Sequence, residues 1–139
     1  MKKTIVNIAP AVAETPRTKR VAAYARVSCG KDAMLHSLAA QIGYYRYYIM
    51  MNPEWRFAGI YADESKTGTK DNREQFQVLL SECRSGNIDM VITKSISRFA
   101  RNTVTLLETV RELKSLGVDV FFEEQNIYTL SAEGEVMLT

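Results

Sequence analysis

Apolar residues along the chain follow two alternating patterns, one typical of buried strands and one of amphipathic helices. Short apolar runs at about residues 19–27, 55–62, 90–93 and 118–122 predict four strands. Between them, apolar residues recur every three or four positions, which predicts helices over about residues 35–51, 73–84 and 103–116. Because strands and helices alternate, we expect an α/β fold with a mostly parallel central sheet of four to five strands, flanked by helices.

The helix ends and the apolar helix faces can also be read from the sequence. Stop signals follow each helix, at Asn52-Pro53, at Ser85-Gly86-Asn87 and at Gly117, and the third helix has a possible cap at Asn102 or Thr103. The apolar sides of the first two helices comprise Leu35, Leu38, Ile42, Tyr45 and Ile49, and then Phe76, Leu79, Leu80 and Cys83. We expect these sides to pack against the sheet.

Polar side chains gather where the predicted strands end. Three strand ends are involved, with Arg26 and Ser28 at the first, Asp63, Glu64 and later Arg73 at the second, and Lys94, Arg98 and Arg101 at the third. Open parallel sheets bind ligands beyond the carboxyl ends of their strands, so we expect these residues to meet at one edge. Arg26 and Ser28 are two residues apart in a strand, which predicts that they leave the same face.

Several arginines around one hydroxyl are suited to binding a phosphate group. The guanidinium group stays charged at physiological pH, and its forked donors match two phosphate oxygens. Neighbouring cations also favour the alkoxide form of a serine such as Ser28, which makes it a better nucleophile. Arg98 and Arg101 are three residues apart, so they would share a face if their segment is helical.

Composition is that of an ordinary globular domain. The 139 residues are 46% hydrophobic and 24% charged, which excludes disordered and fibrous classes and fits a single domain. The net charge is only +2, with 18 basic and 16 acidic side chains, so overall charge does not by itself indicate a nucleic-acid binder. The position of the basic residues therefore has to carry any such argument.

Residues 1–16 are expected to be a flexible leader, because they contain two of the three prolines and no sustained periodicity. Asn7 and Pro10 interrupt what would otherwise resemble a secretory signal, and no other stretch is long and apolar enough to span a bilayer. Cys29 and Cys83 have neither metal-site nor disulfide-framework spacing, so we expect free thiols in a cytoplasmic protein.

Other interpretations of the same residues stay open. Ser28 to Lys31 match the S-x-x-K pattern of acyl-transfer enzymes, although the companion motifs are absent. Cys29 is a rival nucleophile, and His36, the only histidine, is expected in a packing or surface role rather than in a triad. Asp63 and Glu64 could hold a divalent metal in a metal-dependent phosphodiesterase. A non-catalytic regulatory domain of the same fold is a further alternative.

Together these residues resemble the catalytic domain of serine recombinases, especially the large serine recombinases of phages and conjugative transposons. The resemblance covers about residues 18–139, so residues 17–139 are expected to form one resolvase-like catalytic domain. It depends on five segments in order, namely Tyr24 to Ser28, Ser37 to Gln41, Tyr61 to Glu64 with Thr67-Gly68, Asn72-Arg73, and Lys94 to Asn102. Each segment is weakly specific alone, and their order and spacing together are highly specific.

The resemblance implies a site-specific DNA recombinase. Ser28 would attack a DNA phosphodiester to form a 5′-phosphoserine and a free 3′-hydroxyl, with rejoining after strand exchange that needs no ATP, metal or other cofactor. The implied site consists of the nucleophile, four phosphate-binding arginines and an active-site glutamine, which are Ser28, Arg26, Arg73, Arg98, Arg101 and Gln41. Asp63, Lys94 and Ser97 are expected to support them.

The resemblance also implies partners and shows departures. The partners would be DNA and further copies of the protein, as a dimer and a synaptic tetramer at full length, with no membrane. The family's dimerisation helix should begin near Gly134, and the sequence ends at Thr139, so we expect a truncated domain without the C-terminal DNA-binding domains. Such a fragment should be inactive in isolation and monomeric or weakly dimeric. The departures are Ser97 in place of an aspartate of small resolvases, Thr67 in place of a serine, and Tyr128 in place of an acidic or amide residue.

Overall fold

The protein is described here from a computed structural model, which covers residues 18–28, 32–65, 73–100 and 102–131, with the backbone alone at residues 28, 32–37 and 65. The predicted leader, the segment after Ser28, the Thr67-Gly68 loop, Arg101 and the segment from Gly134 to Thr139 lie outside the described residues.

The predicted α/β architecture is confirmed. The elements in chain order are β2 (Lys19–Ser28), α1 (Asp32–Met50), β3 (Trp55–Ser65), α2 (Glu74–Arg84), β4 (Met90–Thr93), α3 (Ile96–Phe99), α4 (Thr103–Ser115), β5 (Asp119–Phe122) and β6 (Ile127–Tyr128). The described strands form one sheet in the order β3-β2-β4-β5-β6, in which only β6 runs antiparallel to its neighbour.

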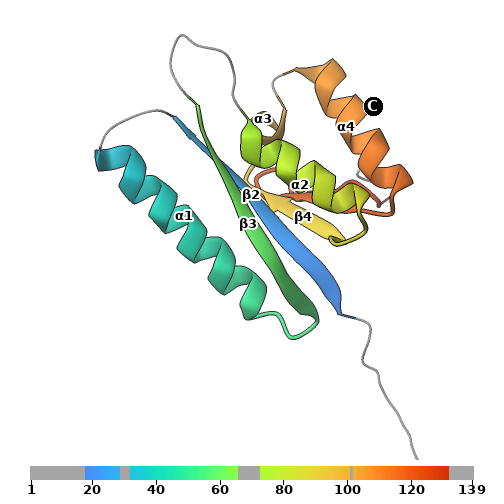
Figure 1. The fold of residues 1–139 in the computed structure, drawn as a ribbon, viewed down its shortest axis with the longest axis horizontal. Coiled ribbons are helices and arrows are strands. Elements are labelled where there is room, and N and C mark those ends of the chain that lie inside the picture. Colours follow the sequence, from blue (N-terminus) through green and yellow to red (C-terminus); the bar gives the residue numbers. More distant parts are fainter. Residues whose placement is uncertain (1–17, 29–31, 66–72, 101, 132–139) are drawn as a thin grey trace, which may run out of the picture.

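Helices cover both faces of the sheet (Figure 1). Alternate residues of β2 point to opposite faces, so Val21, Ala23 and Ala25 pack with Tyr45 and Ile49 of α1. On the opposite face, the partners of Ala22 and Tyr24 are residues of α2, α3 and α4. The predicted apolar side of α2 is buried as expected, at Phe76, Leu79, Leu80 and Cys83. Both faces of β2 are therefore covered, as expected for a parallel sheet.

A row of aromatic rings fixes the short helix α3 against the sheet. Tyr24, Phe76, Phe99 and Phe122 pack edge to face in turn, with ring centroids 5.0, 5.1 and 5.5 Å apart. Each of these four rings is at most 3% exposed. Edge-to-face pairs add about 0.5–1.5 kcal/mol beyond area burial. The row joins β2, α2, α3 and β5 just below the carboxyl edge of the sheet.

One expectation about local structure is wrong. Strand β3 does not end at Ala62 but continues to Ser65, because β2 extends to Ser28 and pairs with it along that length. The condition for a helical face shared by Arg98 and Arg101 is not met within the described residues, since α3 ends at Phe99 and Ala100 has extended backbone angles of φ −145° and ψ 149°. Arg101 itself lies outside the described residues.

The third predicted helix has the expected ends. Asn102 is the N-cap of α4, and its side-chain oxygen accepts a hydrogen bond of 2.9 Å from the Thr105 amide. Gly117 follows the helix with a φ of +78°, a conformation that glycine adopts without strain. Within the described residues, no helix has the length and apolar character needed to cross a membrane.

Candidate active site

The carboxyl end of β2 extends beyond its neighbour β4. Tyr24 is paired with Thr93, the last residue of β4, so the four residues after Tyr24 have only β3 beside them. Helix α3 fills the place next to this overhang. There the Arg98 guanidinium donates a hydrogen bond to the backbone oxygen of Arg26. Arg98 is thus held against the strand two residues before Ser28.

Arg73 lies between α2 and α3 on the same side of the sheet. It is the residue that precedes α2, and its guanidinium carbon stands 3.7 Å from the centre of the Phe76 ring and 5.2 Å from that of Tyr24. Its Nε donates to the Tyr24 hydroxyl at 3.3 Å and its Nη2 to the Phe99 carbonyl oxygen at 2.5 Å. Two of its five N–H donors are used by these described partners.

Asp63 accepts hydrogen bonds that the sequence did not predict. The residue is 6% exposed, and its carboxylate accepts hydrogen bonds from the Tyr24 hydroxyl at 2.8 Å and from the amides of Gln75 and Phe76 at 2.9 and 3.0 Å. These amides belong to the first turn of α2, whose N–H groups have no partner within the helix. Asp63 therefore caps α2 from the neighbouring strand β3, and its charge complements the helix dipole.

The proposed metal pair of Asp63 and Glu64 does not converge. Because β3 continues through both residues, their side chains leave opposite faces of the strand, and Glu64 is exposed while Asp63 is buried. Among the residues that the structure describes, no three histidine, cysteine or acidic side chains come together as a metal site. The geometry of β3 thus does not favour the phosphodiesterase alternative.

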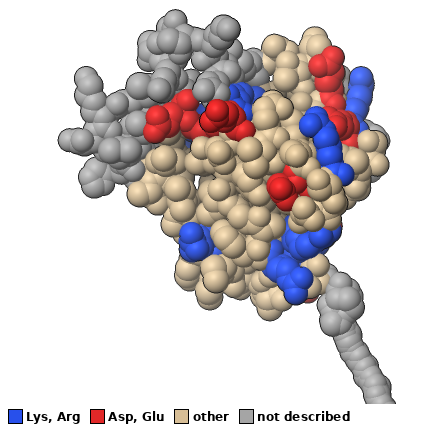
Figure 2. All heavy atoms as spheres, in the orientation of Figure 1, with Lys and Arg blue, Asp and Glu red and all other residues tan. Residues whose placement is uncertain are grey.

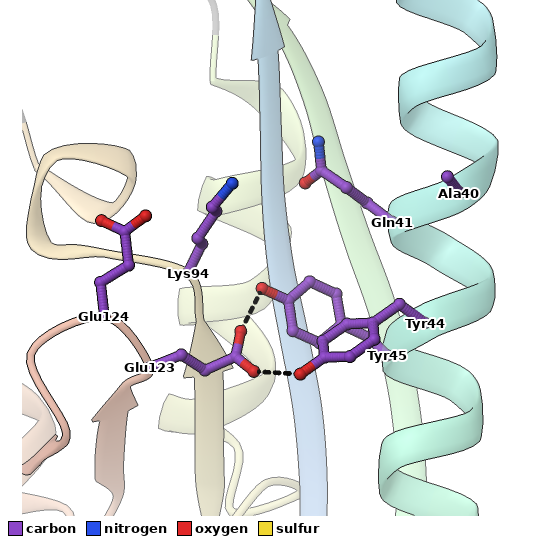
Figure 3. A pocket seen from close by; sticks show the side chains of 7 residues that line it. All are labelled: Ala40, Gln41, Tyr44, Tyr45, Lys94, Glu123 and Glu124. Carbon is purple, nitrogen blue, oxygen red and sulfur yellow. Dashed lines mark hydrogen bonds between the residues drawn. The ribbon is translucent and has the colours of Figure 1, made fainter.

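Gln41 and Lys94 lie on the other face of the sheet, the one covered by α1. They line an open pocket of about 490 Å³ together with Ala40, Tyr44, Tyr45, Glu123 and Glu124. In Figure 3, the Gln41 amide on α1 and the Lys94 side chain after β4 lie on either side of β2, both on the face that α1 covers. Both predicted residues therefore share one pocket near the carboxyl edge of the sheet.

One carboxylate that lines this pocket, that of Glu123, was not predicted as a site residue. The hydroxyls of Tyr44 and Tyr45 donate to the two oxygens of Glu123 at 2.7 and 2.8 Å (Figure 3). Glu123 directly follows β5, and its amide donates to the Thr93 oxygen at 3.0 Å. The acidic pair after β5 was visible in the sequence, but its tyrosine partners are 78 and 79 residues away.

The remaining predicted residues divide into described and undescribed ones. Arg26 is half-buried in β2, where its Cα pairs with that of Asp63. Ser97 is exposed at the start of α3, and its hydroxyl is 3.0 Å from that of the buried Ser95. The Ser28 side chain and the whole of Arg101 lie outside the described residues, so the predicted grouping around Ser28 stays a prediction.

The described candidates thus form two groups separated by β2. Arg73, Asp63 and Tyr24 lie on the α2 face, and Gln41 and Lys94 lie on the α1 face. Arg98 is near both groups, because it contacts the β2 backbone and its charge partly offsets the raised pKa of Tyr45 on α1. A ligand at the end of β2 could reach residues of both groups.

The pKa values of three tyrosines in this region are raised, for different reasons. The pKa of Tyr24 rises to about 12, chiefly because the ring is buried, with Arg73 lowering it and Asp63 raising it. The pKa of Tyr44 also rises to about 12, chiefly because its hydroxyl donates to Glu123, and that of Tyr45 is raised mainly by burial. At neutral pH all three hydroxyls therefore serve as hydrogen-bond donors.

Surface charge alone does not mark a binding face. Figure 2 shows small groups of basic and acidic side chains separated by uncharged residues on the face that it presents. Among the described residues, no broad basic surface covers this face. On this face, overall charge is therefore not what points to a binding site.

Comparison with known protein families adds independent information. A family model described as the resolvase N-terminal domain matches residues 21–139. A Pseudomonas putida protein named resolvase/recombinase is 26% identical in an alignment of 123 residues that covers 86% of this chain and 60% of that protein. The chain thus spans less than two thirds of the length of this curated relative.

Solved structures with the same fold are also similar. A resolvase family site-specific recombinase from Streptococcus pneumoniae is 27% identical with a TM-score of 0.72, over 87% of this chain and 83% of that one. The N-terminal catalytic domain of TP901-1 integrase has a TM-score of 0.61 at 24% identity, over 86% and 88% of the two chains. At that identity the second likeness concerns the fold alone.

Proposed function

The chain belongs to the resolvase N-terminal domain family, and from this premise we propose that it is the catalytic domain of a serine-type site-specific DNA recombinase with Ser28 as the nucleophile. The family and fold confirm the resemblance seen in the sequence. DNA binding and self-association are general properties that the family implies. The role of each site residue is likewise proposed.

In the proposed reaction, Ser28 Oγ attacks a DNA phosphorus atom. A P–O bond to serine forms as the P–O3′ bond breaks, so the number of phosphodiester bonds is unchanged. The serine hydroxyl gives up one proton and the departing 3′-oxygen gains one. Attack of a 3′-hydroxyl on the phosphoserine reverses the step and rejoins the strand, so the energy of the broken bond is kept without ATP.

Arg26, Arg73, Arg98 and Arg101 have the proposed role of stabilising charge on the non-bridging phosphate oxygens. Phosphoryl transfer asks the protein mainly for positioning and charge stabilisation, and fixed guanidinium groups supply both. We assign Gln41 and Lys94 to the α1 side of the same phosphate. Asp63 supports the site indirectly, because it caps α2 and holds the Tyr24 hydroxyl beside Arg73.

One observation carries the proposal most directly. The Arg98 guanidinium donates to the Arg26 backbone at the free end of β2, which brings a permanent cation to the strand that ends in Ser28. Arg26 and Arg98 are 72 positions apart in the sequence, so this contact depends on the tertiary fold. In the proposed reaction this cation would stabilise negative charge on the phosphate.

The decisive experiment is to trap the covalent intermediate. The full-length protein that carries this domain is incubated with a DNA suicide substrate, and adducts are separated under denaturing conditions. We expect a protein–DNA adduct that resists EDTA and disappears in Ser28→Ala while DNA binding persists. An adduct that survives the substitution would place the nucleophile elsewhere, and cleavage that requires a metal would favour the phosphodiesterase.

We also propose that the full-length protein acts as a dimer that forms a synaptic tetramer, whereas the isolated chain is monomeric or weakly dimeric. Analytical ultracentrifugation of the 139-residue chain tests the second part. A stable dimer at micromolar concentration would contradict it. DNA affinity of the isolated chain should stay in the non-specific range of roughly 10⁻⁴ to 10⁻⁶ M at physiological salt.

A further inference from the structure

Glu123 connects two elements that hold candidate site residues. Its backbone is fixed to the end of β4 through the bond to the Thr93 oxygen, and the next amide, of Glu124, donates to the Lys94 oxygen at 2.8 Å. Its side chain reaches in the other direction, to the hydroxyls of Tyr44 and Tyr45 on α1. The residue therefore ties α1 to the same strand end from which Lys94 and α3 continue.

The two tyrosines restrict the rotation of α1 about its own axis. Adjacent residues of an α-helix point about 100° apart around the axis, yet Tyr44 and Tyr45 both reach one carboxylate, each on its own oxygen. A single bond would allow α1 to roll around it. Two bonds from different directions hold α1 in one rotation.

Apolar packing and the polar contact together fix α1. In the described side chains of α1, only Tyr45 and Ile49 are buried, and both lie in its C-terminal half. Gln41 lies one turn further toward the N-terminus, three residues before Tyr44 and four before Tyr45, which places it on the same side of the helix. The rotation that Glu123 fixes at Tyr44 and Tyr45 therefore also sets the direction of Gln41.

We propose that Glu123 is a positioning residue, which holds α1 through the two tyrosine hydroxyls in the rotation that directs Gln41 toward the carboxyl end of β2. The inference deepens the proposed function, because it assigns a support to a residue of the proposed site. Glu123 itself contacts neither Ser28 nor the arginines in this role. Its effect on the reaction is exerted through Gln41.

The first test uses the 139-residue chain and amide hydrogen exchange by NMR. We expect Glu123→Ala to speed exchange of the α1 amides from Gln41 to Ile49 by about tenfold, as for the loss of one charge-assisted hydrogen bond, and to shift the Gln41 side-chain amide signals. Glu123→Gln should restore most of the protection, because an amide can accept from one tyrosine and donate to the other.

A second disrupting variant and a control variant complete this test. Tyr44→Phe with Tyr45→Phe removes only the hydroxyls and should reproduce Glu123→Ala even if that variant folds poorly. Glu112→Ala is the matched control, since it breaks another carboxylate bridge between elements, the one from Arg84 of α2 to Glu112 of α4 at 2.5 and 3.0 Å. It should leave α1 exchange unchanged. Unaltered α1 exchange and Gln41 signals in the double tyrosine variant would overturn the proposal.

The second test asks whether the effect passes through Gln41. In the full-length protein, Glu123→Ala should lower the rate of adduct formation about tenfold, and Glu123→Gln should recover it. In a Gln41→Ala background, Glu123→Ala should cause no further loss, because residues that act as a unit are not additive. An equal loss in both backgrounds would refute positioning through Gln41. If the unmodified protein forms no adduct, the proposed function fails, and the exchange experiment alone decides whether Glu123 positions α1.

Discussion

The cap that Asp63 provides for α2 leads to a prediction that separates a structural carboxylate from a metal ligand. Each carboxylate oxygen of Asp63 accepts from one backbone amide, that of Gln75 or that of Phe76. In Asp63→Asn, an NH₂ group replaces one of these oxygens and cannot accept from the N–H that faces it. One buried donor then loses its acceptor. We expect a loss of about 2 kcal/mol of unfolding free energy, within the range of roughly 1–3 kcal/mol for an unsatisfied buried group.

Asp63→Ala removes all three hydrogen bonds and should cost more. Loss of a helix cap costs about 1–2 kcal/mol, and the Tyr24 hydroxyl, which is fully buried with its ring, loses the acceptor at 2.8 Å. The two effects share one site and are not additive, so we expect a total near ~3 kcal/mol. Glu64→Gln is the control, because Glu64 is the exposed neighbour on the same strand and should change stability by less than about 0.5 kcal/mol.

Urea unfolding followed by circular dichroism measures these differences, and the assay is repeated with millimolar Mg²⁺. We expect the order Glu64→Gln, Asp63→Asn, Asp63→Ala from least to most destabilised, with no gain from Mg²⁺ in the unmodified protein. A metal bound to the folded state would raise its stability by mass action. Stabilisation by Mg²⁺ that Asp63→Asn abolishes, or an Asp63→Ala variant as stable as the control, would refute the cap.

Three other predictions concern the same half of the molecule. Tyr24 should make stability fall as pH rises from 10 to about 12, because the folded chain keeps its proton and the unfolded chain gives it up near pH 10. Its share of the loss is roughly 2–3 kcal/mol, beside the shares of Tyr44 and Tyr45, and Tyr24→Phe should remove it in urea titrations across that range. Phe99→Ala should cost about 3–5 kcal/mol in thermal unfolding, whereas Val104→Ala on the exposed side of α4 should cost less than about 1 kcal/mol. Arg84→Ala breaks the exposed bridge to Glu112 and should lower the melting temperature only slightly, with a still smaller effect at high salt.

Local sequence patterns predicted the elements well where an element's own residues determine it. The strand at residues 90–93 and the buried side of α2 appear with the predicted residues, because apolar runs and helical spacing depend on burial of the same segment. The end of β3 was predicted three residues too early. Asp63 and Glu64 are poor strand residues by composition, and pairing with β2 over its full length overrides that preference.

The candidate site was predictable only as a set of residues near one edge. The rule for parallel sheets correctly brings Arg73, Arg98 and Lys94 to the carboxyl ends of the strands. It does not say which face of the sheet each side chain occupies, and β2 separates Gln41 and Lys94 from Arg73. The bonds from Tyr44 and Tyr45 to Glu123 depend on the register of β4 and β5 and on the rotation of α1, which no local pattern specifies.

The placement of the arginines depends on the hydrophobic core as much as on charge. Arg73 is held by the faces and hydroxyl of core aromatic residues, with Tyr24 linking it to Asp63, and Arg98 is carried by α3, which the ring of Phe99 fixes in the core. A guanidinium placed by packed rings keeps its position before an anion arrives, so less ordering remains to be done on binding. If these arginines bind phosphate as proposed, core substitutions such as Phe99→Ala should weaken that binding even where the domain stays folded, because they release the carbonyl and the helix that hold Arg73 and Arg98 in place.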